Sequence, residues 1–267
     1  EHGLEERVIG VAFDGSGLGL DGKIWGGEFL LCDTTSFVRA AHLEYLPLPG
    51  GDAAIMRPYR TATGYLLHLL GPEAPSANES LSRWLSPKEL DGVVRQIATG
   101  LNTPWCSIMG RLFDAVAALT GVRGSIDYEG QAAIELEMQA QRHGGPPPDR
   151  YRFVVEKAAD GYVIFPAEVL SAIVRDVATG LSVATIAAAF HESVARMTAE
   201  VCELLSAETG VRTVALSGGV FQNRILVSRT AALLRAEQFR VLLHRSLPPN
   251  DGCVSLGQAV VAARLPK

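Results

Sequence analysis

Two aspartates stand in glycine-rich loops near opposite ends of the chain, and they are the first candidates for chemistry. Asp14 follows an apolar run in residues 13–17 (FDGSG), and Asp251 stands in residues 248–252 (PPNDG). A carboxylate among small residues leaves its oxygens free for a cation and leaves backbone N–H groups free for an anion. If the two loops face each other, the two aspartates are ligands of one metal ion. The plainer alternatives are a turn at Asp14 and a helix N-cap at Asp251.

Two carboxylates are too few ligands for a tight metal site, and the sequence offers no local partners. The histidines show no H-x-H or H-x-x-x-H spacing, so each is interpreted as a surface or core residue: His2, His42, His68, His143, His191 and His244. The cysteines form no C-x-x-C pair and are interpreted as reduced thiols: Cys32, Cys106, Cys202 and Cys253. A complete metal site therefore needs ligands from outside this chain.

A third loop, residues 217–223 (SGGVFQN), places Gly218 and Gly219 between a predicted strand and a predicted helix. Paired glycines let the backbone approach a phosphate closely, and the helix N-terminus adds N–H donors and a favourable dipole. The loop lacks the lysine of a P-loop and the third glycine of a dinucleotide fingerprint. It is either a different kind of nucleotide-binding loop or a tight strand-to-helix turn.

The elements that position these loops alternate between strands and helices. Strands are predicted over residues 8–13, 24–32 and 37–43 as an antiparallel meander. Helices are predicted over 52–70 with Asp52 as the cap and a break at Pro58, over 87–99 with Ser86 as the cap, and over 110–120 and 128–142. Beyond the Gly/Pro-rich residues 144–148, a hairpin at 151–165, a helix at 182–207, a strand at 211–216, a helix at 221–238, a strand at 240–243 and a helix at 253–264 follow. The pattern predicts a duplicated α/β fold with two lobes, residues 1–148 and 149–267, and a ligand cleft between them.

Composition excludes several functional classes. The 267 residues carry a net charge of −5 and no basic block, which argues against nucleic-acid binding. No apolar stretch is long enough for a membrane span, and no signal peptide is evident, so a soluble, cytoplasmic protein is expected. The chain does not begin with methionine, so it is expected to be a piece of a longer protein.

Several motifs, in order along nearly the whole chain, resemble the carboxy-terminal part of the HypF-type carbamoyltransferases that mature nickel–iron hydrogenases. The motifs are FDGSG (13–17), IWGGEF (24–29), PLPGGDAA (47–54), GRLFDA (110–115), YEGQAAIE (128–135), SGGVFQN (217–223) and PPNDG (248–252).

The resemblance implies an actin/Hsp70-like (ribonuclease H-like) duplicated fold with a nucleotide cleft between its lobes. It also implies that Asp14 and Asp251 ligate a divalent metal, iron or zinc, whose remaining ligands are histidines in a segment just before Glu1. The implied nucleotide-binding positions are Gly110, Asp114, Gly218, Gly219 and Asn223. The implied ligands are ATP, AMP or carbamoyl-adenylate.

The function implied by the resemblance is transfer of a carbamoyl group from carbamoyl-adenylate to the C-terminal cysteine of a partner protein, HypE. The adenylate is made by upstream HypF domains that this chain lacks, so the chain alone is expected to be incomplete for the overall reaction. Two alternatives stay open: an O-carbamoyltransferase acting on a small molecule, and a nucleotide-binding docking module that transfers nothing.

Overall fold

A mixed sheet forms the centre of the molecule. The computed structural model describes residues 2–264. Strands β1 (Val8–Leu18), β2 (Ile24–Cys32) and β3 (Phe37–Leu43) form the predicted antiparallel meander. Every second side chain in the first half of β1 is buried, because one face of the strand packs into the core: Ile9, Val11 and Phe13.

The sheet continues on both sides of the meander, in the order β6-β7-β3-β2-β1-β8-β9. On one side, β8 (Thr213–Ser217) pairs parallel to β1, and β9 (Arg240–Leu242) pairs parallel to β8. On the other side, β7 (Gly161–Phe165) pairs parallel to β3 and forms a hairpin with β6 (Val154–Ala158). The short strands β4 (Leu46–Pro47) and β5 (Trp105–Ile108) join through β5, which pairs parallel to β2.

The predicted mixture of strands and helices is confirmed, but the strands are not divided between two sheets. Strands from both sides of residue 148 belong to one sheet, and β8 lies directly beside β1. The predicted boundary at residue 148 rests on local sequence patterns alone. Such patterns do not indicate which distant strand a given strand pairs with. Residues 144–148 connect α6 to β6 rather than separating two sheets.

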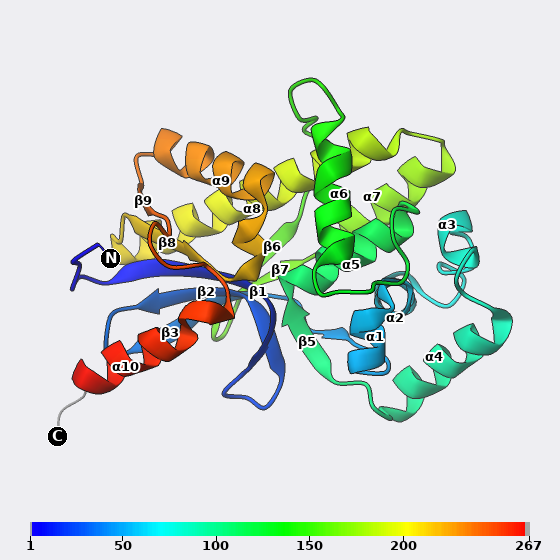
Figure 1. Cartoon of the computed structure of the whole chain (residues 1–267), viewed down its shortest axis with the longest axis horizontal. Helices are drawn as coiled ribbons and strands as arrows, with labels where there is room; N and C mark the ends of the chain where they lie inside the picture. Colours follow the sequence, from blue (N-terminus) through cyan, green and yellow to red (C-terminus); the bar gives the residue numbers. More distant parts are fainter. Residues whose placement is uncertain (1, 265–267) are drawn as a thin grey trace.

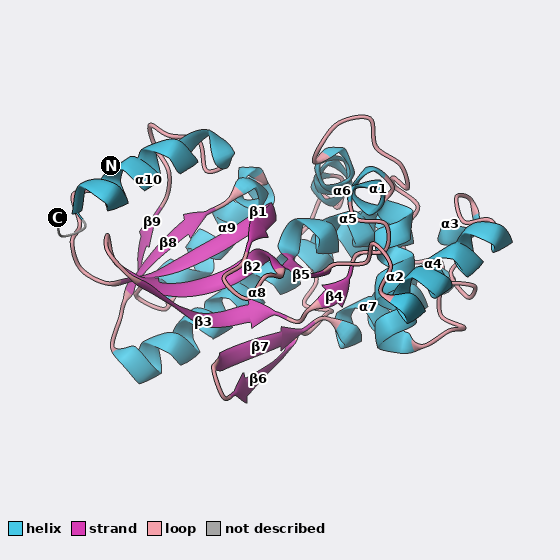
Figure 2. Ribbon diagram, turned by 90° about the horizontal axis from the view of Figure 1, so that it is seen from below, coloured by secondary structure: helices cyan, strands magenta, loops and turns pink. Residues whose placement is uncertain are grey.

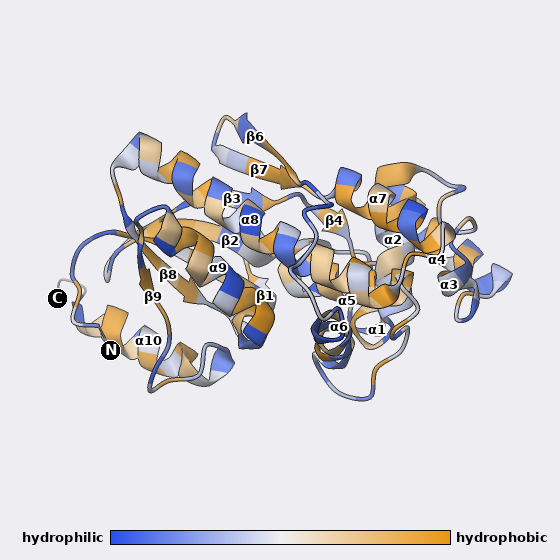
Figure 3. Cartoon of the chain, turned by 90° about the horizontal axis from the view of Figure 1, so that it is seen from above, coloured by the Kyte–Doolittle hydropathy of each residue, from blue (hydrophilic) through white to orange (hydrophobic). Residues whose placement is uncertain are grey.

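Two long helices lie on one side of the sheet (Figure 1). These are α8 (Val183–Thr209) and α9 (Arg224–Ala236). Ser182 caps α8, where its Oγ accepts a hydrogen bond of 3.2 Å from the backbone N–H of Thr185, and Gly210 ends the helix at φ +74°. The strands β1 and β8 are largely coloured as hydrophobic in Figure 3, which agrees with their place in the core.

The remaining helices gather beyond one end of the sheet (Figure 2). Helices α1 (Asp52–Met56) and α2 (Pro58–Leu70) are separate, as the proline at position 58 predicts, but Gly51 rather than Asp52 is the N-cap. Helix α4 (Pro87–Thr99) has the predicted Ser86 cap and ends at Gly100. The others in this group are α3 (Glu79–Ser82), α5 (Met109–Leu119), α6 (Gln131–Gln141) and α7 (Ala167–Ala178).

The last helix, α10 (Val254–Arg264), has no buried residue and stands apart from the sheet in Figure 2. No helix within residues 2–264 is long and apolar enough to cross a membrane.

Candidate functional site

A cavity of about 450 Å³ opens where β8 ends beside the middle of β1. Ligands commonly bind at the carboxyl ends of strands in α/β folds, where loops converge. The walls come from the irregular middle of β1, the first turn of α5, the segment that begins α6, the 3-10 helix η1 (Gly219–Gln222) and the start of the 3-10 helix η2 (Asp251–Cys253). The predicted loop at Asp14 is therefore wrong: β1 continues to Leu18, and its pairing with β2 shifts register between Phe13 and Gly17. The polar and glycine residues lining it are Asp14, Gly15, Arg111, Glu129, Gly130, Glu137, Gly219, Gln222, Asn223, Asn250 and Asp251.

The cavity brings together four of the residues predicted from the sequence: Asp14, Gly219, Asn223 and Asp251. They come from widely separated parts of the chain, so the fold gathers them. The other three predicted residues, Gly110, Asp114 and Gly218, do not line the cavity and lie behind its wall.

The Asp14 carboxylate joins β1 to the start of η1. Its Oδ1 accepts hydrogen bonds from the backbone N–H of Gly15 at 2.8 Å and from that of Gly219 at 3.3 Å. The base of this junction is aromatic, because Phe221 of η1 stacks on Phe13 with ring centroids 5.2 Å apart. The packing of these two rings fixes η1 against the middle of β1.

Gly218 and Gly110 allow the backbone to pack closely at this junction. Gly218 has φ +99°, and a Cβ there would lie 2.1 Å from the carbonyl oxygen of Phe13. A Cβ on Gly110 would lie 3.1 Å from the carbonyl oxygen of Asp14. Both glycines therefore shape the wall of the cavity, and direct contact with a nucleotide stays a prediction for them.

Asp114 is buried beneath the cavity and pairs with Arg111. Its Oδ2 lies 2.9 Å from Nη1 of Arg111, and the two side chains are 2% and 4% exposed. The contact is not aligned as a hydrogen bond: both oxygens of Asp114 and the Nε and Nη1 of Arg111 lack a hydrogen-bond partner among the described residues. Burial raises the pKa of Asp114 to about 6, and the Arg111 charge opposes that rise.

Asn223 is held in a fixed orientation by a histidine that the sequence analysis interpreted as a surface or core residue. The Oδ1 of Asn223 caps α9 by accepting from the Leu226 N–H at 2.9 Å, and its Nδ2 lies 2.8 Å from Nε2 of His191. The Nδ1 of His191 lies 2.7 Å from the carbonyl oxygen of Ala187, so it donates there and leaves Nε2 to accept from Asn223. Burial lowers the pKa of His191 to about 4, and the ring is neutral at pH 7.

Glu137 is a cavity residue that sequence reasoning missed. Its Oε1 accepts from the backbone N–H groups of Arg224 at 2.8 Å and Ile225 at 3.3 Å, at the start of α9. A carboxylate is favourable at a helix N-terminus. No local pattern marks this role, because the acceptor comes from α6 and the donors from α9. Arg111 and Glu129, by contrast, stand inside the GRLFDA and YEGQAAIE motifs.

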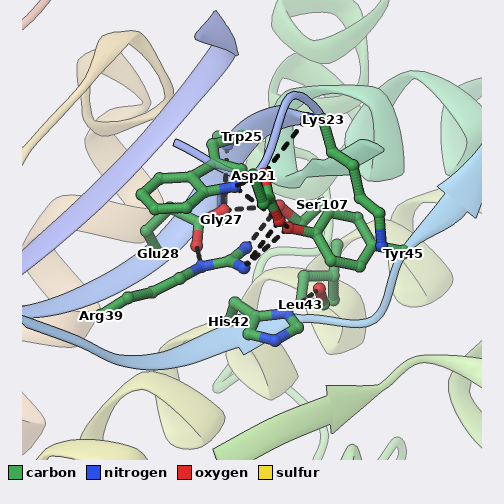
Figure 4. A network of polar contacts seen from close by, with 11 residues as sticks. Asp21, Lys23, Trp25, Gly27, Glu28, Arg39, His42, Leu43, Tyr45 and Ser107 are labelled. Carbon is green, nitrogen blue, oxygen red and sulfur yellow. Dashed lines mark hydrogen bonds and ion pairs between the residues drawn. The ribbon is translucent and has the colours of Figure 1, made fainter. Parts of the chain in front are cut away.

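A second polar cluster supports β2, β3 and β5 (Figure 4). The buried carboxylate of Glu28 accepts from Oγ of Ser107 and from Nε of Arg39, both at 2.5 Å. Arg39 also donates to the hydroxyl oxygen of Tyr45 at 2.7 Å and lies over the Trp25 ring. These polar groups satisfy one another, so the cluster joins the strands.

The predicted metal ligands Asp14 and Asp251 line the same cavity. Within residues 2–264, no group of three or more His, Cys, Asp or Glu side chains is close enough together to hold a metal ion. The two carboxylates fit part of a ligand set for a hard or borderline cation, and additional ligands are required to complete it.

Comparison with known proteins identifies the family. Residues 10–258 match the family described as carbamoyltransferase, Kae1-like domain, second subdomain. The chain belongs to the HypF carbamoyltransferase family. It is 39% identical to carbamoyltransferase HypF2 of Cupriavidus necator, over 98% of this chain and 34% of that protein. It is 37% identical to a carbamoyltransferase HypF homolog of the same organism, over 100% of this chain and 68% of that protein.

A crystal structure of full-length HypF in its phosphate- and nucleotide-bound form has the same fold as this HypF-family chain. The TM-score is 0.90 at 43% sequence identity, over 98% of this chain and 40% of that chain. The chain therefore spans well under half the length of that full-length HypF and about a third of the length of several curated relatives.

Proposed function

We propose that this chain performs the carbamoyl-transfer step of a HypF protein. A carbamoyl group passes from carbamoyl-adenylate to the C-terminal cysteine of HypE, on the way to the cyanide ligands of nickel–iron hydrogenases. The observation that carries the proposal is the convergence of Asp14, Gly219, Asn223 and Asp251 on one cavity in a HypF-family fold. The adenylate is made by upstream HypF domains.

The nucleotide part of the donor binds along η1 and the start of α9. The region offers the glycine backbone of η1, which a ligand can approach closely, and the fixed amide of Asn223. The first N–H groups of α9 are already bonded to Glu137. Gly110 and Gly218 act by allowing the close packing that forms this wall, and Asp114 acts by holding Arg111. A full-length HypF relative binds phosphate and nucleotide, which supports a nucleotide as a ligand of this family.

The attacking sulfur belongs to the partner protein. Burial raises the pKa of the Cys106 and Cys202 thiols and that of Cys32, so these groups stay protonated at pH 7. The thiolate of the HypE cysteine attacks the carbamoyl carbon, a carbon–sulfur bond forms, and the bond to the AMP phosphate oxygen breaks. AMP leaves with the electron pair.

Asp14 and Asp251 would hold an iron or zinc ion together with histidines of an upstream segment. When bound, the ion supplies Lewis-acid polarisation of the carbonyl or of the leaving phosphate. Asp14 is suited to this role because the two N–H donors engage Oδ1, which leaves Oδ2 free of described hydrogen bonds.

The sheet described above is one lobe of the duplicated actin/Hsp70-like fold, and the preceding part of HypF supplies the other. The family description as a second subdomain supports this arrangement. The cavity at the end of β8 then faces the other lobe as part of the nucleotide cleft.

Calorimetry with AMP and ATP tests the proposal, together with mass spectrometry of a HypE C-terminal peptide incubated with complete HypF, carbamoyl phosphate and ATP. Asn223→Asp keeps a good helix cap but adds a negative charge beside the phosphate, and we expect AMP affinity to fall about tenfold. Ser182→Asp adds the same charge at another capped helix, away from the cavity, and should leave affinity unchanged.

Absence of AMP and ATP binding at millimolar concentration would contradict the assignment of the cavity. Carbamoylation of a small hydroxyl compound instead of the peptide would favour an O-carbamoyltransferase. Nucleotide binding with no transfer by complete HypF would favour a docking module.

A further inference from the structure

Arg111 and Glu129 face a common space beside Gly15. A Cβ placed on Gly15 would lie 3.2 Å from Oε1 of Glu129 and 3.4 Å from Nη2 of Arg111. Within residues 2–264 no ion pair joins these two side chains, and the ion pair of Arg111 is with Asp114. A hydrogen-bond donor and a charged acceptor therefore border the same small volume, which is open because residue 15 has no side chain.

The guanidinium group of Arg111 is buried and incompletely hydrogen-bonded. Its side chain is 4% exposed, yet its Nε and Nη1 have no hydrogen-bond partner in the part of the chain that the structure describes. The ion pair with Asp114 fixes one side of the guanidinium group, and the residue lines the cavity. Nη2 is the atom that faces the space beside Gly15, while Nε and Nη1 are turned into the protein without a hydrogen bond. A guanidinium group buried in this way is costly to maintain, and an acceptor on a ligand at Nη2 offsets part of that cost.

The charges around the space select the class of ligand. Glu129 and Asp14 both line this end of the cavity, and their carboxylates repel a phosphate placed beside Gly15. A neutral planar group with one carbonyl and one NH₂ satisfies both sides: the carbonyl oxygen accepts from Arg111, and the NH₂ donates to Glu129. That group is a primary carboxamide, which is the end of a carbamoyl ester.

We propose that Arg111, Glu129 and the bare backbone of Gly15 form the subsite that recognises the carbamoyl group and distinguishes it from other acyl groups. This inference rests on the proposed function. The nucleotide lies on the η1 side of the cavity, and the carbamoyl group extends toward Gly15. Glu129 is the specificity-determining residue, because an acetyl group has the carbonyl but no N–H to donate.

The experiment compares two stable analogues of the adenylate in which a sulfamate link replaces the phosphate: 5′-O-(N-carbamoylsulfamoyl)adenosine, called the carbamate below, and 5′-O-(N-acetylsulfamoyl)adenosine, called the acetate. They differ by NH₂ against CH₃ at the acyl end. AMP serves as a third ligand that has no acyl group. We expect calorimetry on the wild-type chain to give about 10- to 100-fold tighter binding of the carbamate than of the acetate, as expected for a hydrogen bond to a charged acceptor. Glu129→Leu removes the acceptor and should abolish that preference without weakening AMP binding, because the carboxylate that is removed repels a phosphate.

Gly15→Ala provides a second test that does not depend on Glu129. Residue 15 has no positive φ, so alanine is compatible with the backbone, and its methyl group occupies the proposed carbamoyl position. Binding of the carbamate should weaken more than binding of AMP. Gly92→Ala, in α4 with open space around it, is the matched control and should change neither affinity.

The outcomes separate the two proposals. AMP binding with equal affinity for carbamate and acetate overturns the carbamoyl subsite and leaves the nucleotide assignment standing. A preference for the carbamate that survives Glu129→Leu also overturns the subsite. If the wild-type chain binds none of the three ligands, both proposals fail.

Discussion

Asp114 is expected to make the protein less stable as pH rises from acid to neutral, which is opposite to the usual behaviour of a carboxylate. The perturbation is Asp114→Asn, which removes the titrating group and keeps its shape. The pKa of Asp114 is about 6 in the folded protein, against 3.8 for an ordinary aspartate in the unfolded chain. Because this pKa is raised, the favourable contribution is present in full below the unfolded value and is lost as pH rises through the folded value.

The magnitude follows from the two pKa values. Each unit of pKa difference corresponds to about 1.4 kcal/mol, so the full effect is about 3 kcal/mol. Between about pH 4.5 and pH 7, about 2 kcal/mol of it develops. We therefore expect the free energy of unfolding of the wild type, minus that of the Asn variant, to fall by about 2 kcal/mol over this interval.

Urea denaturation at several pH values measures this difference, and effects of groups common to both proteins cancel in the subtraction. Asp33→Asn is a suitable control, because hydrogen bonds from Thr35 and Ser36 lower the pKa of Asp33 to about 2. The contribution of Asp33 is lost only as pH falls toward that value, so its difference curve should be flat over the same interval. A flat or rising curve for Asp114→Asn would refute the inference that its carboxylate is buried and poorly compensated.

Two further predictions concern the packing around the site. Gly218→Ala places a methyl group against the Phe13 carbonyl at φ +99° and should destabilise the protein by about 3 kcal/mol or more. The control Gly180→Ala, at φ +76° with no atom nearby, should cost about 1–2 kcal/mol. Equal losses of stability in thermal unfolding would show that the close contact is unimportant. Ser107→Ala removes the hydroxyl that donates to Glu28 and accepts from Arg39, and should lower the free energy of unfolding by about 1–3 kcal/mol in urea denaturation. The control Ser82→Ala, which removes an exposed hydrogen bond, should lower it by under about 0.5 kcal/mol. An unchanged stability of Ser107→Ala would mean that water replaces the hydroxyl in the cluster of Figure 4.

Local chemistry could be predicted well from the sequence. The Ser86 cap, the helix break at Pro58 and the antiparallel meander follow from short-range preferences of the residues involved, and the structure has all three. The segments at Asp14, Gly219 and Asp251 stand out because glycine and aspartate are concentrated there, and the cavity includes all three residues, although Asp14 lies in an irregular part of β1 and not in the predicted loop.

Long-range relations could not be predicted in the same way. The residues around Val214 carry no sign that their strand pairs with β1, so local sequence does not predict a single sheet. Asp114 has the sequence context of a ligand-binding residue, but its burial depends on α5 packing beneath the cavity. The hydrogen bonds of Glu137 and His191 form because α6 and α8 contact the start of α9. These segments are far apart in the sequence, so no short stretch of it predicts the contacts.

The parallel pairing of β1 with β8 also has a consequence for how the protein is made. Asp14 and Gly219, joined by a hydrogen bond, are 205 residues apart, so the ribosome releases β1 long before its neighbour exists. Until then, one edge of β1 presents unpaired N–H and C=O groups, an arrangement that favours pairing with other chains. Closure of so long a loop is slow, and nascent chains that stop before β8 should depend on chaperones to stay in solution.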